Sequence, residues 1–198
     1  MGNKKIFSYK MAKRYYRKYY YRKYNRAKIL RNYFKARLDT SMRAALDTAG
    51  FKFIENNATS RNLAQVLESC SDWNAYKQLF HSFKLTGLAM EAIPNLPIAG
   101  QDNRPFAANG TYCVGLITSG DTQNYANLLE AKNTILLTPT QSQRKYLSFN
   151  GGETSWIVTS QTSDLDGKFY TETNSLATSG GMVWSIKFSF YITFKNPN

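Results

Sequence analysis

The chain has 198 residues, of which 42% are hydrophobic, and carries a formal net charge of +13 with only two cysteines. This length suits one ordinary domain with a tail, and the apolar content is sufficient for a packed core. The two distant cysteines do not indicate a disulfide scaffold, and no apolar run approaches the ~18 residues that span a membrane. We therefore expect no membrane association, and we expect Cys70 and Cys113 to be free, buried thiols.

The positive charge is concentrated at the N-terminus. Residues 1–37 contain 14 Lys and Arg and no acidic residue, whereas residues 38–198 contain 12 basic and 13 acidic residues. Eight tyrosines lie within the first 33 residues. A block of like charge usually forms a solvated tail that binds polyanions, and a tail that serves only solubility does not need so many tyrosines. We predict a nucleic-acid-binding arm, residues 1–32, and a separate domain, residues 33–198.

Between Lys13 and Arg26, basic pairs recur every four or five residues with tyrosines between them. Lys and Arg neutralise phosphates, and tyrosine rings offer faces on which unpaired bases stack, so the pattern favours single-stranded nucleic acid. If all 14 basic groups bound a single strand, log K would fall with log salt at a slope near −10. The predicted nucleic-acid-binding residues are Lys4, Lys5, Lys10, Lys13, Arg14, Tyr15, Tyr16, Arg17, Lys18, Tyr19, Tyr20, Tyr21, Arg22, Lys23, Tyr24, Arg26, Lys28 and Arg31.

The charge spacing of the arm also predicts its conformation. Like charges four residues apart, as at Arg14, Lys18 and Arg22, oppose an isolated helix. We predict an arm that is disordered or extended when free and ordered only on nucleic acid. The same Lys/Arg-rich run matches a nuclear localisation signal, which would make nuclear import receptors partners, although packaging alone explains the charges.

The domain begins with alternating apolar and polar residues. This alternation over residues 34–46 predicts one long, half-buried strand, followed by a turn at Gly50 and a short strand at Phe51 and Phe53. The apolar period then changes to that of amphipathic helices at residues 63–70 and 73–80. We predict a short helical insertion at about residues 60–80 in a chain that is otherwise β.

The rest of the chain contains further strand patterns separated by turn residues. Strands are expected at residues 83–93, 112–118, 134–138, 145–149, 156–159 and 168–173, with Pro94 ending the first and a long loop at 95–110. In the last strand, apolar side chains occupy every second position from Trp184 to Phe194, so another sheet must cover them. About eight strands with short turns predict an all-β sandwich or barrel.

No group of residues in the sequence indicates catalysis. His81 is the one histidine and has no partner at metal-ligand spacing, so we interpret it as structural. The pairs Gly151-Gly152 and Gly180-Gly181 lack a P-loop lysine and read as turns. Residues 164–167 (DLDG) lack most ligands of a calcium loop and predict a polar hairpin turn, with an ion at a subunit contact as the alternative. We predict a protein that is not an enzyme and has no cofactor or metal.

Several segments, in the same order, resemble the capsid proteins of circoviruses and related circular single-stranded DNA (CRESS-DNA) viruses. They are the basic-aromatic arm leading into residues 33–38 (YFKARL), residues 73–76 (WNAY), residues 83–88 (FKLTGL) with Ile93-Pro94, and residues 188–195 (FSFYITFK). The resemblance implies a single eight-stranded jelly roll, an icosahedral T=1 shell of sixty copies, and an inward-facing arm that packages circular ssDNA. It also implies a location in the virion and, during assembly, in the host nucleus.

Two other functions remain open from the sequence. A small RNA virus or satellite uses a coat protein of the same fold with a basic arm. A non-capsid single-strand nucleic-acid-binding protein with a β-domain would carry an equally suitable arm. Uniform shells seen by microscopy, and the nucleic acid recovered from them, would distinguish these functions.

Overall fold

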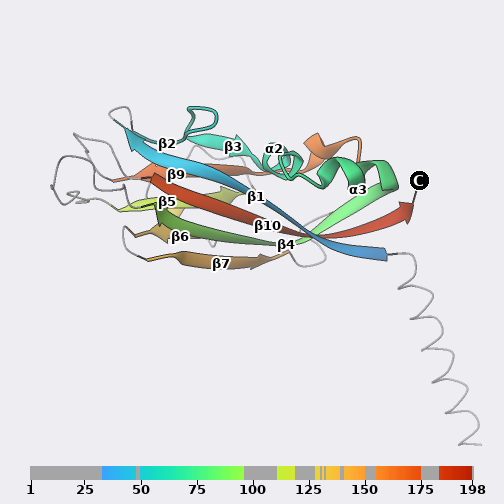
Figure 1. The fold of residues 1–198 in the computed structure, drawn as a ribbon. Helices are drawn as coiled ribbons and strands as arrows, with labels where there is room; N and C mark the ends of the chain where they lie inside the picture. Colours follow the sequence, from blue (N-terminus) through green and yellow to red (C-terminus); the bar gives the residue numbers. More distant parts are fainter. Residues whose placement is uncertain are drawn as a thin grey trace, which may run out of the picture.

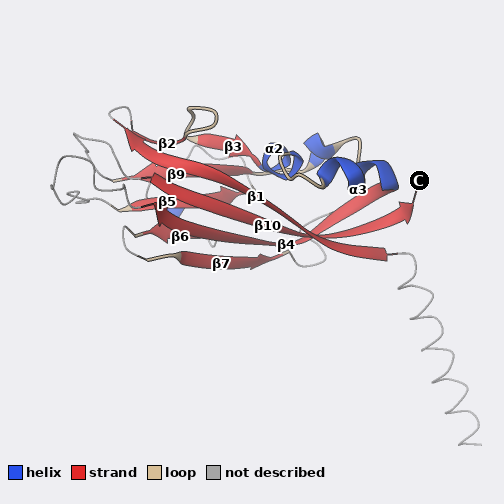
Figure 2. Ribbon diagram, in the orientation of Figure 1, coloured by secondary structure: helices blue, strands red, loops and turns tan. Residues whose placement is uncertain are grey.

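The computed structural model describes residues 33–47, 50–95, 111–118, 128–129, 131, 133–138, 141–149, 155–174 and 183–197. In these residues two antiparallel β-sheets pack face to face, and two short helices lie beside them near the end where β1 begins (Figures 1 and 2). The predicted arm, residues 1–32, and most of the predicted loop at 95–110 lie outside the described residues. Our expectations for both remain predictions.

The sequence patterns predicted most of the elements. In chain order they are β1 (Tyr33–Asp47), β2 (Gly50–Phe53), β3 (Ser60–Asn62), α2 (Leu63–Glu68), α3 (Trp73–Leu79), β4 (Phe80–Asn95), β5 (Tyr112–Ile117), β6 (Thr134–Leu137), β7 (Gln143–Ser148), β8 (Ile157–Val158), the 3₁₀ turn η1 (Thr162–Asp164), β9 (Lys168–Thr173) and β10 (Val183–Pro197). The predicted helical insertion is confirmed by α2 and α3.

The strands form two sheets of different size. The first sheet has the order β2-β1-β10-β4-β7, with β8 paired to β4, and the second has the order β3-β9-β5-β6. Strands β1, β10, β4 and β7 face β3, β9, β5 and β6, which is the predicted eight-stranded jelly roll. The short strands β2 and β8 extend the first sheet.

The core lies between the sheets, and β10 forms its centre. This strand pairs with both β1 and β4, and its alternate apolar side chains from Trp184 to Phe194 are buried, as predicted. The rings of Phe169 on β9 and Phe188 on β10 lie 4.6 Å apart and connect the sheets. Trp184 donates from Nε1 to the carbonyl of Thr138 at 3.1 Å, which satisfies its polar atom in the interior.

The two helices pack with their apolar faces against the sandwich. Leu63, Val66 and Leu67 of α2 are buried, and Trp73 of α3 packs edge-on against Phe83 of β4 at 5.1 Å between ring centroids. The helices are too short to be stable alone, so burial of these side chains holds them in place. Cys70 follows α2 and is buried and free, as is Cys113 on β5, which confirms the prediction for both thiols.

The structure differs from the strand predictions at β4 and at β3. Strand β4 does not end at Pro94 but continues to Asn95. The neighbouring β7 pairs with β4 only as far as Ala92, so at Pro94 the side away from β10 has no strand partner, and the missing N–H of proline costs no ladder bond there. Strand β3 was not predicted, because its three residues, Ser-Arg-Asn, have no apolar alternation.

Candidate nucleic-acid interface

The arm is joined to the sandwich at Tyr33, the first residue of β1. All eighteen residues predicted to bind nucleic acid lie before it, outside the described residues, and their role remains a prediction. The described part of the candidate interface is therefore the surface around Tyr33.

Four stacked aromatic rings lie beside the start of β1. Phe34 stacks on Phe80 at 5.5 Å and on Tyr76 at 5.8 Å, and Phe194 lies 5.1 Å from both Tyr76 and Phe80. Because Phe34 pairs in register with Phe194, these rings connect β1, β10, β4 and α3. They fix the point at which the chain enters the sheet.

Tyr33 points to the opposite side of the sheet and stacks on Trp156 there. Its ring stacks on that of Trp156 with the centroids 5.6 Å apart and an angle of 20° between the planes. The ammonium of Lys195, which pairs in register with Tyr33, lies 4.4 Å from the centroid of the Trp156 ring. Tyr33 and Trp156 remain 40% and 37% exposed, so an aromatic pair with an adjacent cation is open to ligands.

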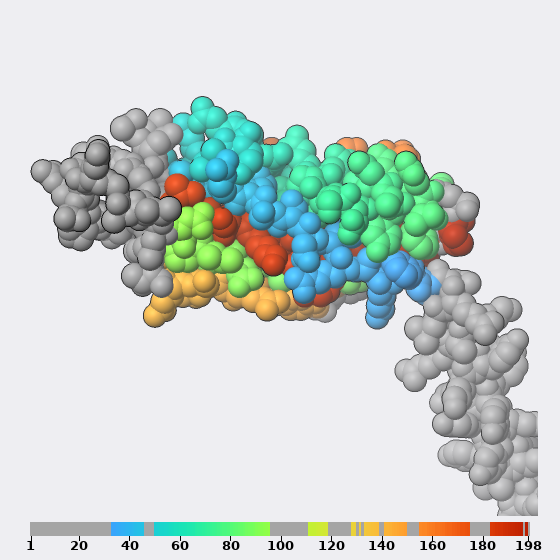
Figure 3. Space-filling view, in the orientation of Figure 1, coloured from blue at the N-terminus to red at the C-terminus, as the bar shows by residue number. Residues whose placement is uncertain are grey.

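The pairing registers define the surface on which this aromatic pair lies. Paired residues on neighbouring strands point to the same side of a sheet, so the residues in register with Tyr33, Arg37 and Arg43 share the side that faces away from the core. We call this surface the basic face; Figure 3 views the molecule from this side, with β1 in blue beside β10 in red. Its described basic residues are Lys35, Arg37, Arg43, Lys52, Lys84, Arg144, Lys187 and Lys195. The acidic side chains described on it are Asp39 and Glu91 of the strands, and Glu55, which reaches Arg43 from the turn after β2.

Arg37 and Arg43 each form an ion pair on this face. The Nε of Arg37 donates to Asp39 Oδ1 at 2.9 Å, and its Nη2 donates to Ser189 Oγ at 3.1 Å. Burial works to raise the pKa of Asp39, but hydrogen bonds from Ser189 and Arg37 outweigh it and hold that pKa below its usual value. Arg43 pairs with Glu55 at 3.4 Å. Glu91 lies in register between Lys187 and Arg144, so positive charge still predominates on the face.

The outer side of the second sheet is different. Every residue from Tyr112 to Leu116 is buried, so β5 is covered on both sides. Leu128 packs over Gly115, and its Cδ1 lies 2.7 Å from where a Cβ atom would stand if residue 115 were not a glycine. Among the described residues, the strands of this side carry one basic and one acidic side chain, Lys168 and Glu172. The two outer surfaces of the sandwich therefore differ in their charge and in how far their residues are buried.

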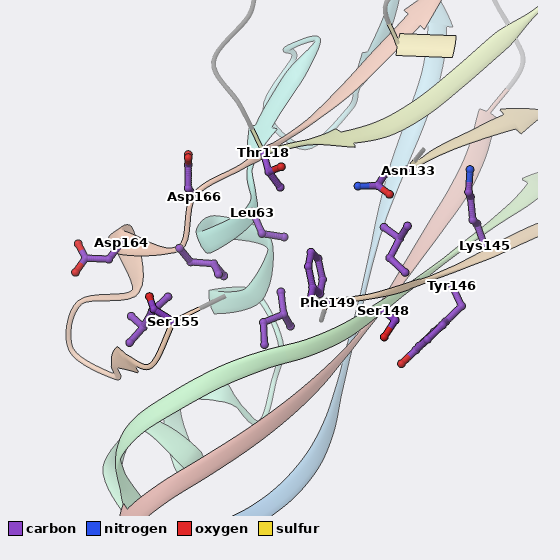
Figure 4. A pocket seen from close by; sticks show the side chains of 14 residues that line it. Leu63, Thr118, Asn133, Lys145, Tyr146, Ser148, Phe149, Ser155, Asp164 and Asp166 are labelled. Atoms are coloured by element: carbon purple, nitrogen blue, oxygen red, sulfur yellow. The ribbon is translucent and has the colours of Figure 1, made fainter. Parts of the chain in front are cut away.

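A cavity of about 710 Å³ opens between the sheets beside β7 and β8. Figure 4 shows Lys145 on one side of it, with Asp164 and Asp166 on the other. The ammonium of Lys145 donates to the carbonyl of Thr134 at 3.1 Å, so it serves to join β7 and β6. The lining residues therefore do not converge as an acid, a base and a nucleophile would.

The remaining candidate residues serve as structure where they are described. His81 is exposed on β4, and its carbonyl accepts a hydrogen bond from the Thr159 amide at 2.9 Å. Residues 164–167 connect β8 to β9, which do not pair, so the predicted hairpin turn is wrong; buried Leu165 anchors this connection instead. No three His, Cys, Asp or Glu residues gather within the part of the chain that the structure describes. Gly151-Gly152 and Gly180-Gly181 lie outside it.

In the part of the chain that the structure describes, no helix is long and apolar enough to cross a membrane.

Sequence reasoning missed the functional potential of Trp156 and of the basic face. The signal was present in β10, whose polar positions carry Lys187 and Lys195 and no acidic residue. The stacking of Trp156 on Tyr33 could not be predicted, because it joins residues more than 120 positions apart.

Comparison with known proteins identifies the fold. No family model and no curated protein matches the chain. The Cocksfoot mottle virus structure matches with a TM-score of 0.56 at 9% identity, over 84% of this chain and 97% of that one. The T=1 subviral particle of a Penaeus vannamei nodavirus capsid protein deletion mutant matches with a TM-score of 0.55 at 11% identity, over 83% of this chain and 98% of that one. The 60-mer BFDV capsid protein matches with a TM-score of 0.50 at 11% identity, over 83% of this chain and 95% of that one. The chain therefore has the jelly-roll fold of viral capsid proteins.

Proposed function

We propose that this chain is a viral capsid protein that assembles into a T=1 icosahedral shell of sixty copies and packages circular single-stranded DNA through residues 1–32. One observation carries the proposal: a jelly roll of the kind found in capsid proteins is joined at Tyr33 to a segment with 12 Lys and Arg and no acidic residue. The fold supports a shell subunit, and the segment supports a packaging arm.

The size of the arm suits genome packaging. Lys35 and Arg37 belong to β1, which leaves 12 basic residues before Tyr33. Sixty copies would bring 12 × 60 = 720 positive charges into the shell, enough to neutralise much of a genome on the order of a thousand nucleotides. Tyrosine rings between the cations favour unpaired bases, because every base has a face that can stack.

DNA rather than RNA is proposed from the resemblance of the ordered sequence segments to circovirus capsid proteins. The BFDV capsid protein, a circovirus protein, is among the structures that share the fold, which is consistent with this choice. Sequencing the nuclease-protected nucleic acid of purified particles tests it. Recovery of RNA alone would replace the DNA proposal with that of a small RNA virus or satellite.

Electron microscopy of the expressed protein, with and without residues 1–32, tests the main proposal. The full chain should form uniform shells that retain nucleic acid, and the deletion variant should keep the sandwich but lose the nucleic acid. A variant with the 12 basic residues of the arm changed to Gln, and the tyrosines kept, separates charge from length. Soluble monomers or dimers that bind single strands without forming shells would instead identify a non-capsid nucleic-acid-binding protein.

We also propose that the Lys/Arg-rich arm directs the protein to the host nucleus through import receptors, because its composition matches a localisation signal. Fusion of residues 1–32 to a fluorescent protein tests this, with the Gln-substituted arm as the control. Equal nuclear fractions for the two fusions would contradict it.

A further inference from the structure

The basic face carries the same side-chain chemistry as the arm. Besides its lysines and arginines, it carries Tyr33 stacked on Trp156, and Tyr146 packed edge-on against Tyr191 at 5.4 Å. Tyr146 is 55% exposed. Cations beside exposed rings are the combination that binds single strands, since the cations neutralise phosphates and the rings stack on bases.

The two kinds of side chain also lie close together on this face. Lys195 lies over the Trp156 ring, and Lys35 is two residues beyond Tyr33 on the same side of β1. Further along, Tyr191 pairs with Arg37, and Lys187 pairs with Ser41. The face from Tyr33 to Arg43 is about 33 Å long at ~3.3 Å per residue, which is enough for a strand of several nucleotides.

The position of this face makes it continuous with the arm. The arm enters the sheet at Tyr33, which is itself one of the two stacked rings. A nucleic-acid strand bound by the arm would therefore reach the Tyr33–Trp156 pair first and then the lysines beyond it. The outer side of the second sheet has no comparable chemistry, since Leu128 covers part of it and its described charges balance.

We propose that the basic face is a second binding surface for single-stranded nucleic acid, on which the Tyr33–Trp156 pair stacks a base and Lys195, Lys35 and Lys187 contact phosphates. This rests on the proposed packaging function and adds a site to it. Capsid subunits with this surface hold part of the genome against the sheet, and the arm is not the sole contact.

Tryptophan fluorescence offers a direct test in the full-length chain. Of the three tryptophans, Trp73 and Trp184 are buried, whereas Trp156 is exposed, and the arm contains no tryptophan. Titration with an oligo-dT of about 30 nucleotides should quench Trp156 emission, because the stacked base contacts the indole ring. Binding by the arm is followed in the same sample through the anisotropy of a label on the oligonucleotide.

Substitutions separate stacking from charge. Trp156→Phe should abolish the quenching, and Trp156→Ala should raise the Kd for oligo-dT about fivefold or more. Lys187→Gln should make the salt slope of log K less negative by about 0.7, whereas Lys168→Gln, on the other sheet, should leave it unchanged. An abasic oligonucleotide with the same number of phosphates should bind to the arm without quenching Trp156.

The outcomes distinguish the two proposals. If oligo-dT binds by anisotropy while Trp156 emission stays constant and Lys187→Gln behaves as Lys168→Gln does, the basic face does not bind nucleic acid and the arm alone packages. If the emission changes with protein concentration instead of with oligonucleotide, the face is an interface between copies and this inference is wrong. If oligo-dT does not bind at all, the packaging function itself is refuted.

Discussion

The hydroxyl of Thr171 on β9 donates a hydrogen bond to the carbonyl of Phe51 on β2 at 2.9 Å, and so joins the two sheets of the sandwich inside the protein. The Thr171 backbone amide also donates to the carbonyl of Thr59, just before β3, at 2.8 Å. One buried residue thus connects an edge of the first sheet to the second. Apolar packing supplies most of the cohesion between the sheets, but this bond fixes their relative position at that edge.

Thr171→Val should destabilise the protein, because it keeps the shape of the side chain but leaves the buried Phe51 carbonyl without its hydroxyl donor. We expect the free energy of unfolding to fall by about 1–3 kcal/mol, measured by urea denaturation. Thr171→Ser retains the donor and should lose less. Equal stability of the Val variant and the parent would show that the bond between the sheets contributes nothing.

Phe194 and Phe34 pair in register and belong to the same aromatic cluster. Truncating them to Ala should nevertheless lower the free energy of unfolding by very different amounts. Phe194 is fully buried, so Phe194→Ala should cost about 3–5 kcal/mol of unfolding free energy and loosen α3. Phe34 is 45% exposed, and Phe34→Ala should cost much less. Thermal denaturation of the two variants checks this, and similar losses would contradict the burial assigned to these rings.

The buried thiols predict a loss of stability in mild alkali. Burial, helped by nearby carboxylates, raises the pKa of Cys70 and of Cys113 to about 12, from an ordinary value of 9.0. The unfolded chain therefore loses these protons first, so the stability they contribute is complete below about pH 9 and falls as the pH rises from there towards 12. Urea denaturation at pH 8 and near pH 10 should show this loss.

Substitution of both cysteines provides the control for this effect. A variant with Cys70→Val and Cys113→Val should lose less stability between the two pH values than the parent. In the folded parent at pH 8, a thiol reagent should react only as fast as the protein opens, because both sulfurs are buried and protonated. Immediate labelling of either thiol would contradict their burial.

The salt dependence of nucleic-acid binding should reveal how many cations of the arm take part. With Lys35 and Arg37 in β1, the arm has 12 basic residues, which predicts a slope of log K against log salt of about −8 for the arm alone. Contacts to the basic face would make the slope of the full chain steeper. A slope near −2 for the full chain would mean that most of the arm stays off the strand.

Strands that are buried on one side and exposed on the other could be predicted from the sequence, because their apolar and polar residues alternate. β1 and β10 are such strands, and their patterns gave nearly the observed bounds. In β5 the alternation fails, since Cys113 and Gly115 on its outer side are buried as well as the inner residues, and Leu128 packs over Gly115. The pairing of strands in the sheets could be inferred only from the resemblance, because no local pattern specifies distant partners.

The candidate site was predictable only in part for the same physical reason. The composition of the arm alone predicts a nucleic-acid-binding segment, and this stays a prediction. The basic face is assembled from β1, β2, β4, β7 and β10, and only the registers show that their cations share one side. Trp156 is more than 120 positions from Tyr33 in the sequence, and the chain must fold before the two rings meet.

The central position of β10 has a consequence for synthesis of the protein. Its residues pair with β1 across about 150 positions of the chain, as Asp39 and Ser189 do. At roughly 5–20 residues per second, the ribosome needs on the order of ten seconds to make that interval. During this time β1 exposes an apolar edge that favours aggregation, while the like charges of the preceding arm repel neighbouring nascent chains. The charge of the basic segment would thus keep nascent chains apart while the sheet is unfinished.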